Sequence, residues 1–371
     1  MSASEDPSIA NIPNTLNMLV LDGGGVKGLS SLIILRSLLH QVERLVSEKP
    51  GLSVREGSLR PHQVFNLVVG TSTGGLIALM VGKLGMSVDE CIRQYHTLSH
   101  QIFHNGRHPR GTTFHGFVKP KYCGRLMREQ VDNLFRQQNR DAGLPMITPG
   151  YTDCAVVCRK YDNRFERNPP LVDIPSVICS HRCREYIECS ICDAARATSA
   201  APTYFSEQRI GGHVFIDGGV GCNNPSWAAY DHYNNANKYH HSGMTWRGAR
   251  MVNLGTGTCS PEHSAPTPSG FFRSFRMTKV INLLRDTATN SEFEAAKVRT
   301  LAVNANFDYQ RFSADTGVCW IKMDEYQRLE EIESLTNQYL SHSAVRERLG
   351  KCAEGLASDY VRRLAQGGLD G

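Results

Sequence analysis

The chain has 371 residues, of which 40% are hydrophobic and 21% charged, and these values argue against wholesale disorder. Its formal net charge of +5 is a small excess for this length, which permits contact with an anionic membrane but is not typical of a nucleic-acid-binding protein. No stretch approaches the ~18 apolar residues of a membrane span, and residues 1–15 lack the apolar run of a signal peptide. We therefore expect a cytoplasmic protein that meets lipid peripherally, with its 12 cysteines as reduced thiols.

The first half of the chain repeats a strand, loop and helix pattern. After a flexible lead-in over 1–15, the apolar run 17–21 (NMLVL) predicts a buried strand. The glycine-rich stretch 22–28 follows, and leucines and isoleucines at helical spacing predict a helix over 29–46. A strand at 64–69, a turn at 70–75 and a helix over 74–81 repeat this order. Such alternation predicts an α/β sheet with largely parallel central strands.

The remaining elements are shorter. Strands are predicted at 155–158, 186–189, 214–216 and 251–254, and an alanine-rich helix at 191–201. Pro202 ends that helix. We expect one catalytic core over 16–260 and a mostly helical C-terminal part over 261–371 that packs on the same domain.

The sequence Gly70-Thr71-Ser72-Thr73-Gly74 is a G-x-S-x-G motif between a predicted strand and a predicted helix. This context is the one that the motif requires, because the serine must sit on a sharp turn with its hydroxyl projecting from the sheet edge. The helix N-terminus adds a positive field beside the hydroxyl. Ser72 is therefore the candidate nucleophile; the alternative is a structural turn whose serine caps the helix.

The second motif is the glycine-rich loop DGGGVKG at 22–28. Such a loop before a helix is an anion site, either a phosphate cradle or an oxyanion hole for acyl transfer. Its spacing differs from the G-x-x-x-x-G-K-[ST] pattern of a nucleotide-binding P-loop. A dinucleotide-binding loop also requires an acidic residue at the end of the following strand, and none is clearly placed near positions 45–50. We favour an oxyanion hole formed by Gly23, Gly24 and Gly25. Lys27 either adds charge there or is a solvated lysine at the helix start.

A serine needs a base to act as a nucleophile at neutral pH. Asp217, followed by two glycines, ends the predicted strand 214–216, and we expect it at the same sheet edge as Ser72 because parallel strands end there together. The alternative for Asp217 is an ordinary Asp-Gly turn. A Ser-Asp-His triad stays open, although no downstream histidine follows a predicted strand. The candidates are His232, His240, His241, His263 and His342.

Two further clusters have weaker signals. Cys179, Cys183, Cys189 and Cys192, with His181 among them, lack the two close pairs of a typical zinc site, so ordinary thiols are favoured and no metal is predicted. Aromatic and basic residues alternate after a polar linker, where Phe271 and Phe272 are candidate membrane contacts or an ordinary helix start. A second candidate lip contains Phe114, Phe117 and Val118.

Taken together, these segments resemble the patatin-like phospholipase family over roughly residues 16–260. The matching segments are DGGGVKG at 22–28, GTSTGG at 70–75, AARATSAAPTYF at 194–205, DGG at 217–219, GGVGCNNP at 218–225 and NLGTG at 253–257. The resemblance implies a three-layer α/β/α sandwich with a mostly parallel central sheet.

For the site, the resemblance implies Ser72 as nucleophile, Asp217 as base and an oxyanion hole at Gly23, Gly24 and Gly25, to which the amide of Thr73 is added. It implies calcium-independent cleavage of phospholipid or acylglycerol esters at a membrane or lipid-droplet surface, without a cofactor and without nucleic acid. The family's loop arginine is Lys27 here, which loses the planar guanidinium but not the backbone amides. A silent lipid-binding module, an acyltransferase and a nucleotide-binding enzyme stay as alternatives.

Overall fold

A mixed sheet forms the centre of the computed structural model, which describes residues 15–108, 120–161, 174–180, 188–240, 246, 248–258 and 287–366. Its eight strands within these ranges are β1 (Asn17–Leu21), β2 (Leu67–Thr71), β3 (Asp153–Lys160), β4 (Ser176–Cys179), β5 (Gln208–Ile210), β6 (His213–Asp217), β7 (Arg250–Leu254) and β8 (Asp308–Phe312). The strand order is β5-β6-β3-β2-β1-β7-β8, with β4 also beside β3. The five strands from β3 to β8 in this order are parallel, whereas β4 and β6 run antiparallel to β3.

The sheet separates two hydrophobic cores, because successive side chains of a strand point to opposite faces. Leu19 and Leu21 of β1 belong to the larger core, and Met18 and Val20 to the smaller one. This explains why β1 is a continuous apolar run: both faces are buried under helices.

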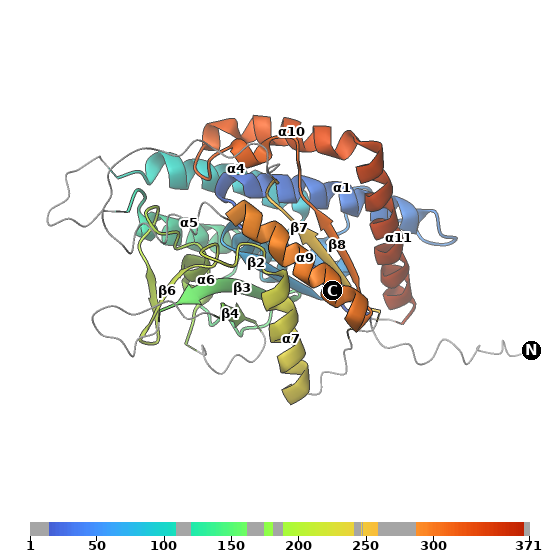
Figure 1. The fold of residues 1–371 in the computed structure, drawn as a ribbon, viewed down its shortest axis with the longest axis horizontal. Helices are drawn as coiled ribbons and strands as arrows, with labels where there is room; N and C mark the ends of the chain where they lie inside the picture. Colours follow the sequence, from blue (N-terminus) through green and yellow to red (C-terminus); the bar gives the residue numbers. More distant parts are fainter. Residues whose placement is uncertain are drawn as a thin grey trace, which may run out of the picture.

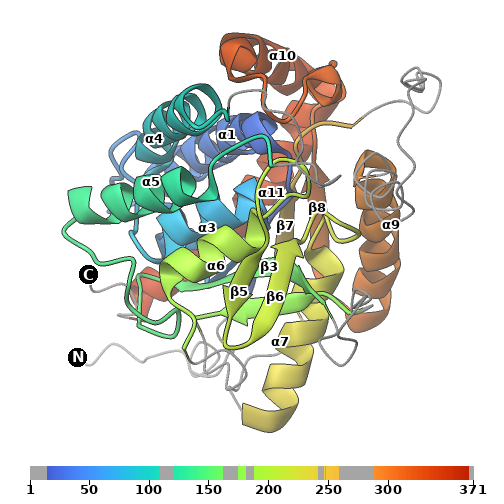
Figure 2. The ribbon, with the colours of Figure 1, turned by 90° about the vertical axis from the view of Figure 1, so that its left-hand side faces the viewer.

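The helices form two outer layers (Figures 1 and 2). The larger core is covered by α1 (Gly28–Ser47), α2 (Pro61–Val64), α3 (Thr73–Gly82), α4 (Val88–His100), α5 (Gly124–Gln137), α6 (Ile191–Thr198), α10 (Leu329–Ser341) and α11 (Ser343–Ala365). The smaller core lies under α7 (Ser226–His240) and α9 (Thr287–Ala305). Short helical turns are η1 (Gly25–Lys27), η2 (Gln101–Asn105), η4 (Val318–Trp320) and η5 (Tyr326–Arg328). The prediction of a three-layer α/β/α sandwich with a mostly parallel sheet is confirmed.

Three predicted details are wrong. The strand predicted over 64–69 begins only at Leu67, because Pro61 starts the helical turn α2, which a hydrogen bond from the Arg60 amide to the Gln63 side chain (2.8 Å) closes. Of the strand predicted over 186–189, the described residues 188–189 belong to no strand, and the strand in this region is β4. The C-terminal part, predicted as mostly helical, also supplies the strand β8, which was not predicted because its Asp, Gln and Arg residues interrupt the apolar pattern of a buried strand.

The cysteines are mostly buried free thiols. Cys179, Cys189 and Cys192 of the zinc alternative are free, whereas Cys183 and His181 lie outside the described residues. Cys319 is disulfide-bonded, so the expectation of reduced thiols throughout is wrong at this position.

Candidate active site

Ser72 lies in the tight turn between β2 and α3 with φ 54° and ψ −120°. A non-glycine residue with positive φ is strained, and such strain is held only where the surrounding structure enforces it. Here the Ser72 amide donates to the Thr198 hydroxyl at 2.8 Å, and the flanking glycines permit the tight turn: a Cβ atom on Gly70 would lie 2.1 Å from the carbonyl of Gly74, and one on Gly74 would lie 2.3 Å from the carbonyl oxygen of Leu21. The two glycines of the motif are therefore required by backbone contact.

The hydroxyl of Ser72 donates a 2.6 Å hydrogen bond to Oδ2 of Asp217, across 145 positions of sequence. Both residues are buried, with exposed fractions of 8% for Ser72 and 2% for Asp217. The amide of Gly219 donates to Oδ1 of Asp217 at 2.7 Å and fixes the carboxylate from the other side. The structure thus brings the two residues together in proton-transfer geometry.

The route by which Asp217 reaches Ser72 differs from the expectation. Strand β6 pairs antiparallel with β3, with Asp217 opposite Cys158, so Asp217 does not end a parallel strand. Thr71, which precedes Ser72, lies opposite Val157 in the parallel pair of β2 and β3. Because Val157 and Cys158 are neighbours, the two strands end at one level although they run in opposite directions.

Burial raises the pKa of Asp217 to about 7, because the charged carboxylate is removed from water. The hydrogen bonds from Ser72 and Gly219 act in the opposite direction but only partly offset the burial. A carboxyl group with this pKa is a stronger base than an exposed aspartate.

The glycine loop provides two candidate amide donors. The amide of Gly23 already donates to the carbonyl of Asn223 at 3.1 Å, so it is engaged within the protein. The amides of Gly24 and Gly25 have no acceptor within the part of the chain that the structure describes. The amide of Thr73 begins α3, where a helix leaves its first N–H groups without intrahelical partners. Gly24, Gly25 and Thr73 are therefore the better candidates for binding an anion.

The glycine loop is held by contacts that the sequence did not indicate. The amide of Val26 donates to the carbonyl of Met323 at 2.9 Å, and a Cβ atom on Gly25 (φ +59°) would lie 2.1 Å from that oxygen. The hydroxyl of Tyr95 donates to the carbonyl of Gly25 and is also hydrogen-bonded to the hydroxyl of Thr73. Tyr95 of α4 thus connects the glycine loop to the serine turn.

A buried ion pair holds the first residue of this loop. Nη1 of Arg311 in β8 lies 2.9 Å from Oδ2 of Asp22, and both side chains are at most 4% exposed. Asn253 donates to the other oxygen of Asp22 at 2.8 Å, and Glu292 accepts from Arg311 at 2.7 Å. Burial raises the pKa of Asp22 to about 6, although Arg311 opposes the shift. The role of Arg311 was not predicted from the sequence, because charged residues are rarely buried.

The other predicted residues are placed as follows. Lys27 lines the same pocket as Ser72, is partly buried and has no hydrogen-bond or ion-pair partner among the described residues; burial lowers its pKa to about 8. Phe271 and Phe272, and likewise Phe114, Phe117 and Val118, lie outside the described residues.

The hydroxyl of Ser72 contacts Asp217 rather than a histidine. His232 lies in α7 and His342 at the start of α11, and neither lines a pocket beside Ser72. His241, His263 and the side chain of His240 lie outside the part of the chain that the structure describes.

Two pockets of different polarity meet at Ser72 and Met323, which line both. The polar pocket is lined by Asp22, Gly23, Gly24, Lys27, Asp217, Gly219, Asn223, Thr256, Gly257 and Ser291. The other is mainly apolar and is lined by Gly25, Thr73, Leu76, Tyr95, Leu98, Ser99, Ile102, Phe103, Met127, Ser199, Ala201, Tyr204 and Phe205. The serine hydroxyl therefore lies between a polar and an apolar compartment.

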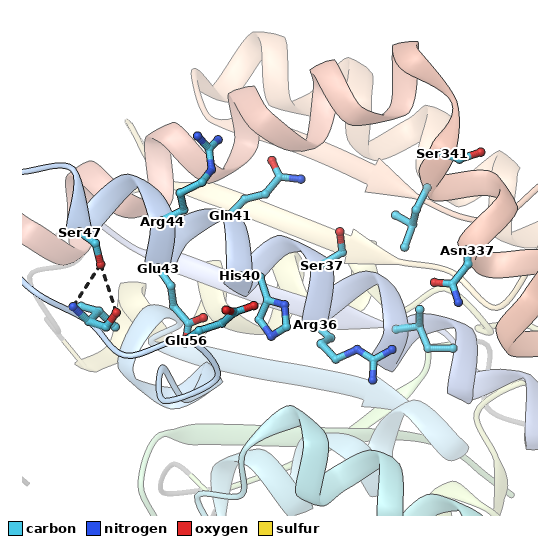
Figure 3. A pocket seen from close by; sticks show the side chains of 13 residues that line it. Arg36, Ser37, His40, Gln41, Glu43, Arg44, Ser47, Glu56, Asn337 and Ser341 are labelled. Atoms are coloured by element: carbon cyan, nitrogen blue, oxygen red, sulfur yellow. Dashed lines mark hydrogen bonds between the residues drawn. The ribbon is translucent and has the colours of Figure 1, made fainter.

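A third hollow lies between α1 and α10 and carries none of the predicted site residues (Figure 3). Its charged side chains already serve structural contacts. Glu43 accepts from the amides of Gly57 (2.9 Å) and Leu59 (2.7 Å), and Arg44 pairs with Glu48 at 3.0 Å. Ser47 and Ser341, which also line it, donate to the backbone carbonyls of Val54 and Gln338.

Comparison with known proteins decides the family. The family model described as patatin-like phospholipase matches residues 19–230, which contain the serine turn, the glycine loop and Asp217. The chain belongs to the patatin-like phospholipase family.

Relatives of this patatin-like chain carry related names. Calcium-independent phospholipase A2-gamma of Rattus norvegicus is 24% identical over 93% of this chain and 40% of that protein. A cGAMP-activated phospholipase of Vibrio cholerae is 30% identical over 60% of this chain and 58% of that protein. Patatin-like protein 4 of Arabidopsis thaliana is 22% identical over 91% of this chain and 86% of that protein. The chain thus spans less than half the length of the mammalian relatives that it matches.

Neither a membrane-spanning helix nor a metal-binding cluster is found among the described residues. Within them, no helix combines the length and the apolar character needed to cross a bilayer. The same part of the chain contains no group of three or more His, Cys, Asp or Glu side chains placed to hold a metal ion.

The buried carboxyl group predicts a pH-dependent stability. Because the pKa of Asp217 is raised to about 7 by folding, ionisation destabilises the folded state as pH rises from its unfolded value of 3.8 to about 7. Asp217→Asn removes this cost. We expect the variant's advantage in unfolding free energy over the unsubstituted protein to grow by about 1.4 kcal/mol per pH unit from pH ~5 to ~7, and then to level off.

Urea denaturation at several pH values measures this difference. Asp141→Asn, at an exposed position, is the matched control and should give no such growth. A difference between Asp217→Asn and the unsubstituted protein that is constant with pH contradicts the prediction.

Proposed function

We propose that this protein is a calcium-independent serine lipid acyl hydrolase, of the phospholipase A, lysophospholipase or acylglycerol lipase type, with Ser72 as nucleophile and Asp217 as base. The observation that carries the proposal is the 2.6 Å hydrogen bond from the Ser72 hydroxyl to the buried Asp217 carboxylate, at a strained turn. Family membership and the names of the relatives support a lipid ester as the substrate class.

In the proposed first half-reaction, Oδ2 of Asp217 accepts the Ser72 proton while the serine oxygen attacks the ester carbonyl. The carbonyl oxygen becomes an oxyanion, which the amides of Gly24, Gly25 and Thr73 stabilise by hydrogen bonds. Collapse of this intermediate forms the acyl-enzyme, and Asp217 returns its proton to the departing alcohol or lysolipid. In the second half-reaction Asp217 accepts a proton from water, whose oxygen attacks the acyl-enzyme carbonyl; as the second tetrahedral intermediate collapses and releases the fatty acid, Asp217 returns that proton to the Ser72 oxygen.

The two pockets suggest how the substrate lies. A fatty-acyl chain gains free energy by leaving water, so we assign it to the apolar pocket beside Leu98, Ile102 and Phe205. The leaving group then occupies the polar pocket, where Lys27 and Asn223 offer an ammonium group and an amide. In this orientation Ser72 attacks the carbonyl that joins the two compartments.

The polar pocket also supports independence from calcium. Calcium requires several oxygen ligands, usually including free carboxylates. The two carboxylates that line this pocket are both engaged: Asp22 pairs with Arg311 at 2.9 Å, and Asp217 accepts from Ser72 at 2.6 Å.

The first test removes each member of the pair. Ser72→Ala and Asp217→Asn should each lower hydrolysis of a fatty-acyl ester by about 10³-fold or more, because either change removes the activated nucleophile. The assay contains a calcium chelator, in which the unsubstituted protein should keep full activity. Ser341→Ala on α10 is the control and should be fully active.

A fluorophosphonate probe adds a readout that separates a hydrolase from a silent lipid-binding module. It should label the unsubstituted chain and not Ser72→Ala. Full activity in either site variant, or labelling that survives in Ser72→Ala, contradicts the proposed mechanism.

The second test uses pH. Only ionised Asp217 accepts a proton, so kcat/KM for an uncharged ester should be flat above the pKa of about 7 and fall tenfold for each pH unit below it. Initial rates from about pH 5 to about pH 9 measure this limb. A limb centred near pH 4 would assign the base role to an ordinary exposed carboxyl group and contradict the role of the buried Asp217.

The third test addresses the acyl pocket. Ile102→Trp places a larger side chain in the apolar pocket, so it should lower kcat/KM for a long-chain ester by about tenfold relative to a butyrate ester. Leu144→Trp, at an exposed position, is the control for adding an indole and should leave the ratio unchanged. An unchanged long-to-short ratio in Ile102→Trp would remove this pocket from acyl recognition.

A further inference from the structure

Two side-chain hydroxyl groups hold the backbone of the glycine loop from outside it. The hydroxyl of Thr256, just after β7, donates to the carbonyl of Gly23 at 2.7 Å. The hydroxyl of Tyr95 in α4 donates to the carbonyl of Gly25. Thr256 is 5% exposed and Tyr95 is 4% exposed, so water has little access to either bond.

Two glycines of the DGGGVKG motif make room for these hydroxyl groups. A Cβ atom on Gly24 would lie 2.4 Å from Oγ1 of Thr256, and one on Gly28 would lie 2.4 Å from the hydroxyl oxygen of Tyr95. Both distances are far shorter than van der Waals contact. Glycine at these two positions therefore allows the hydroxyl groups to reach the loop.

The carbonyl contacts set the direction of the loop amides. In a trans peptide the N–H points away from the C=O of the same unit, so a carbonyl held on one side leaves the next residue's amide pointing to the other. The Gly23 carbonyl, held by Thr256, therefore directs the amide of Gly24. The Gly24 carbonyl accepts from the Lys27 amide at 3.3 Å and directs the amide of Gly25.

Tyr95 fixes the peptide unit that follows Gly25. This unit is held at both ends, because its carbonyl accepts from Tyr95 and its N–H, that of Val26, donates to Met323 at 2.9 Å. A tyrosine hydroxyl has a single proton, which here goes to Gly25, so the Thr73 hydroxyl must donate to the Tyr95 oxygen. Tyr95 thereby connects the loop to the residue whose amide is the third candidate donor for the oxyanion.

We propose that Thr256 and Tyr95 are positioning residues of the oxyanion hole, whose hydroxyl groups keep the amides of Gly24 and Gly25 directed at the oxyanion of acyl transfer. Glycine peptides rotate at little steric cost, so the amides of an unanchored loop would have to be ordered during the reaction. Donors that are already in place need no such reorganisation. This inference rests on the proposed function, because it assigns the loop amides to the same oxyanion.

The test removes each hydroxyl and keeps the shape of the side chain. Thr256→Val and Tyr95→Phe should each lower kcat for a soluble short-chain ester by about tenfold and change KM by less than about twofold, because an oxyanion hole acts on the transition state rather than on bound substrate. Thr256→Ser keeps the hydroxyl and should keep kcat within about twofold of the unsubstituted value. Asp217 accepts from Ser72 and Gly219 rather than from either hydroxyl, so the acid limb of kcat/KM should stay near pH 7.

Matched controls remove similar hydroxyl groups elsewhere. Thr336 in α10 is buried and donates to a backbone carbonyl at 2.6 Å, and Tyr360 in α11 is also buried. Thr336→Val and Tyr360→Phe should leave kcat unchanged, and an equal loss in them overturns the proposal. A loss confined to KM, or a loss in Thr256→Ser as large as in Thr256→Val, also overturns it. Full kcat in either site variant removes that residue from the role.

A fluorophosphonate probe separates positioning from folding. Attack on its phosphorus also places negative charge on an oxygen, so both variants should react about tenfold more slowly but still label one site per chain at completion. A lower final extent of labelling at an unchanged rate would mean a smaller folded fraction and contradicts a positioning role.

Hydrogen exchange follows the loop without any substrate. The amides of Gly23 and Val26, which both donate to backbone carbonyls, should exchange about tenfold faster in Thr256→Val and Tyr95→Phe, respectively, while amides in α11 exchange as before. Unchanged exchange contradicts the anchoring. If the unsubstituted chain neither hydrolyses the ester nor reacts with the probe, the proposed function fails, while exchange still decides whether the two hydroxyl groups hold the loop.

Discussion

The close approach of three backbone segments at one edge of the sheet is the constraint on which the site depends. The serine turn, the glycine loop and the loop after β6 touch through backbone atoms, where no side chain fits. A Cβ atom on Gly74 would lie 2.3 Å from the Leu21 carbonyl oxygen, and one on Gly218 would lie 2.5 Å from that of Val157. The interior packs too tightly to yield to such overlaps. Loss of either glycine would therefore separate Ser72 from its partners.

The ion pair between Asp22 and Arg311 extends this constraint to the far part of the chain. Burying two charges is costly, and a well-packed apolar pair in the same place is often at least as stable. The position of the pair indicates a role in connecting distant segments: Asp22 is the first residue of the glycine loop, and Arg311 lies in β8. Arg311 thereby holds the start of the glycine loop, of which Gly23 and Gly24 line a pocket together with Ser72. The C-terminal strand is in this sense part of the candidate site.

The sequence predicted those parts of the fold whose signals are local. Strand β1 is one apolar run, and the turn at Ser72 is marked by two glycines and flanked by an apolar strand and helix. The direction of β6 was not predictable, because an apolar run reads the same in a parallel and an antiparallel strand. Arg311 was not predicted for another reason: its burial is explained only by partners in the glycine loop and in α9, and no local sequence pattern indicates such distant contacts. Membrane contacts proposed at Phe271 and Phe272 stay predictions.

The burial of Asp217 joins the stability of the protein to its proposed chemistry. The same removal from water that destabilises an ionised carboxylate raises its pKa to about 7 and makes it a stronger base. If Asp217 were fully exposed, its ionisation would not destabilise the fold, but the carboxylate would be too weak a base for the proposed activation of Ser72. If it were buried without the Gly219 amide, its pKa would rise further and the group would stay protonated at neutral pH. The hydrogen bonds from the Ser72 hydroxyl and the Gly219 amide therefore keep the pKa of the buried carboxyl group close to neutral pH.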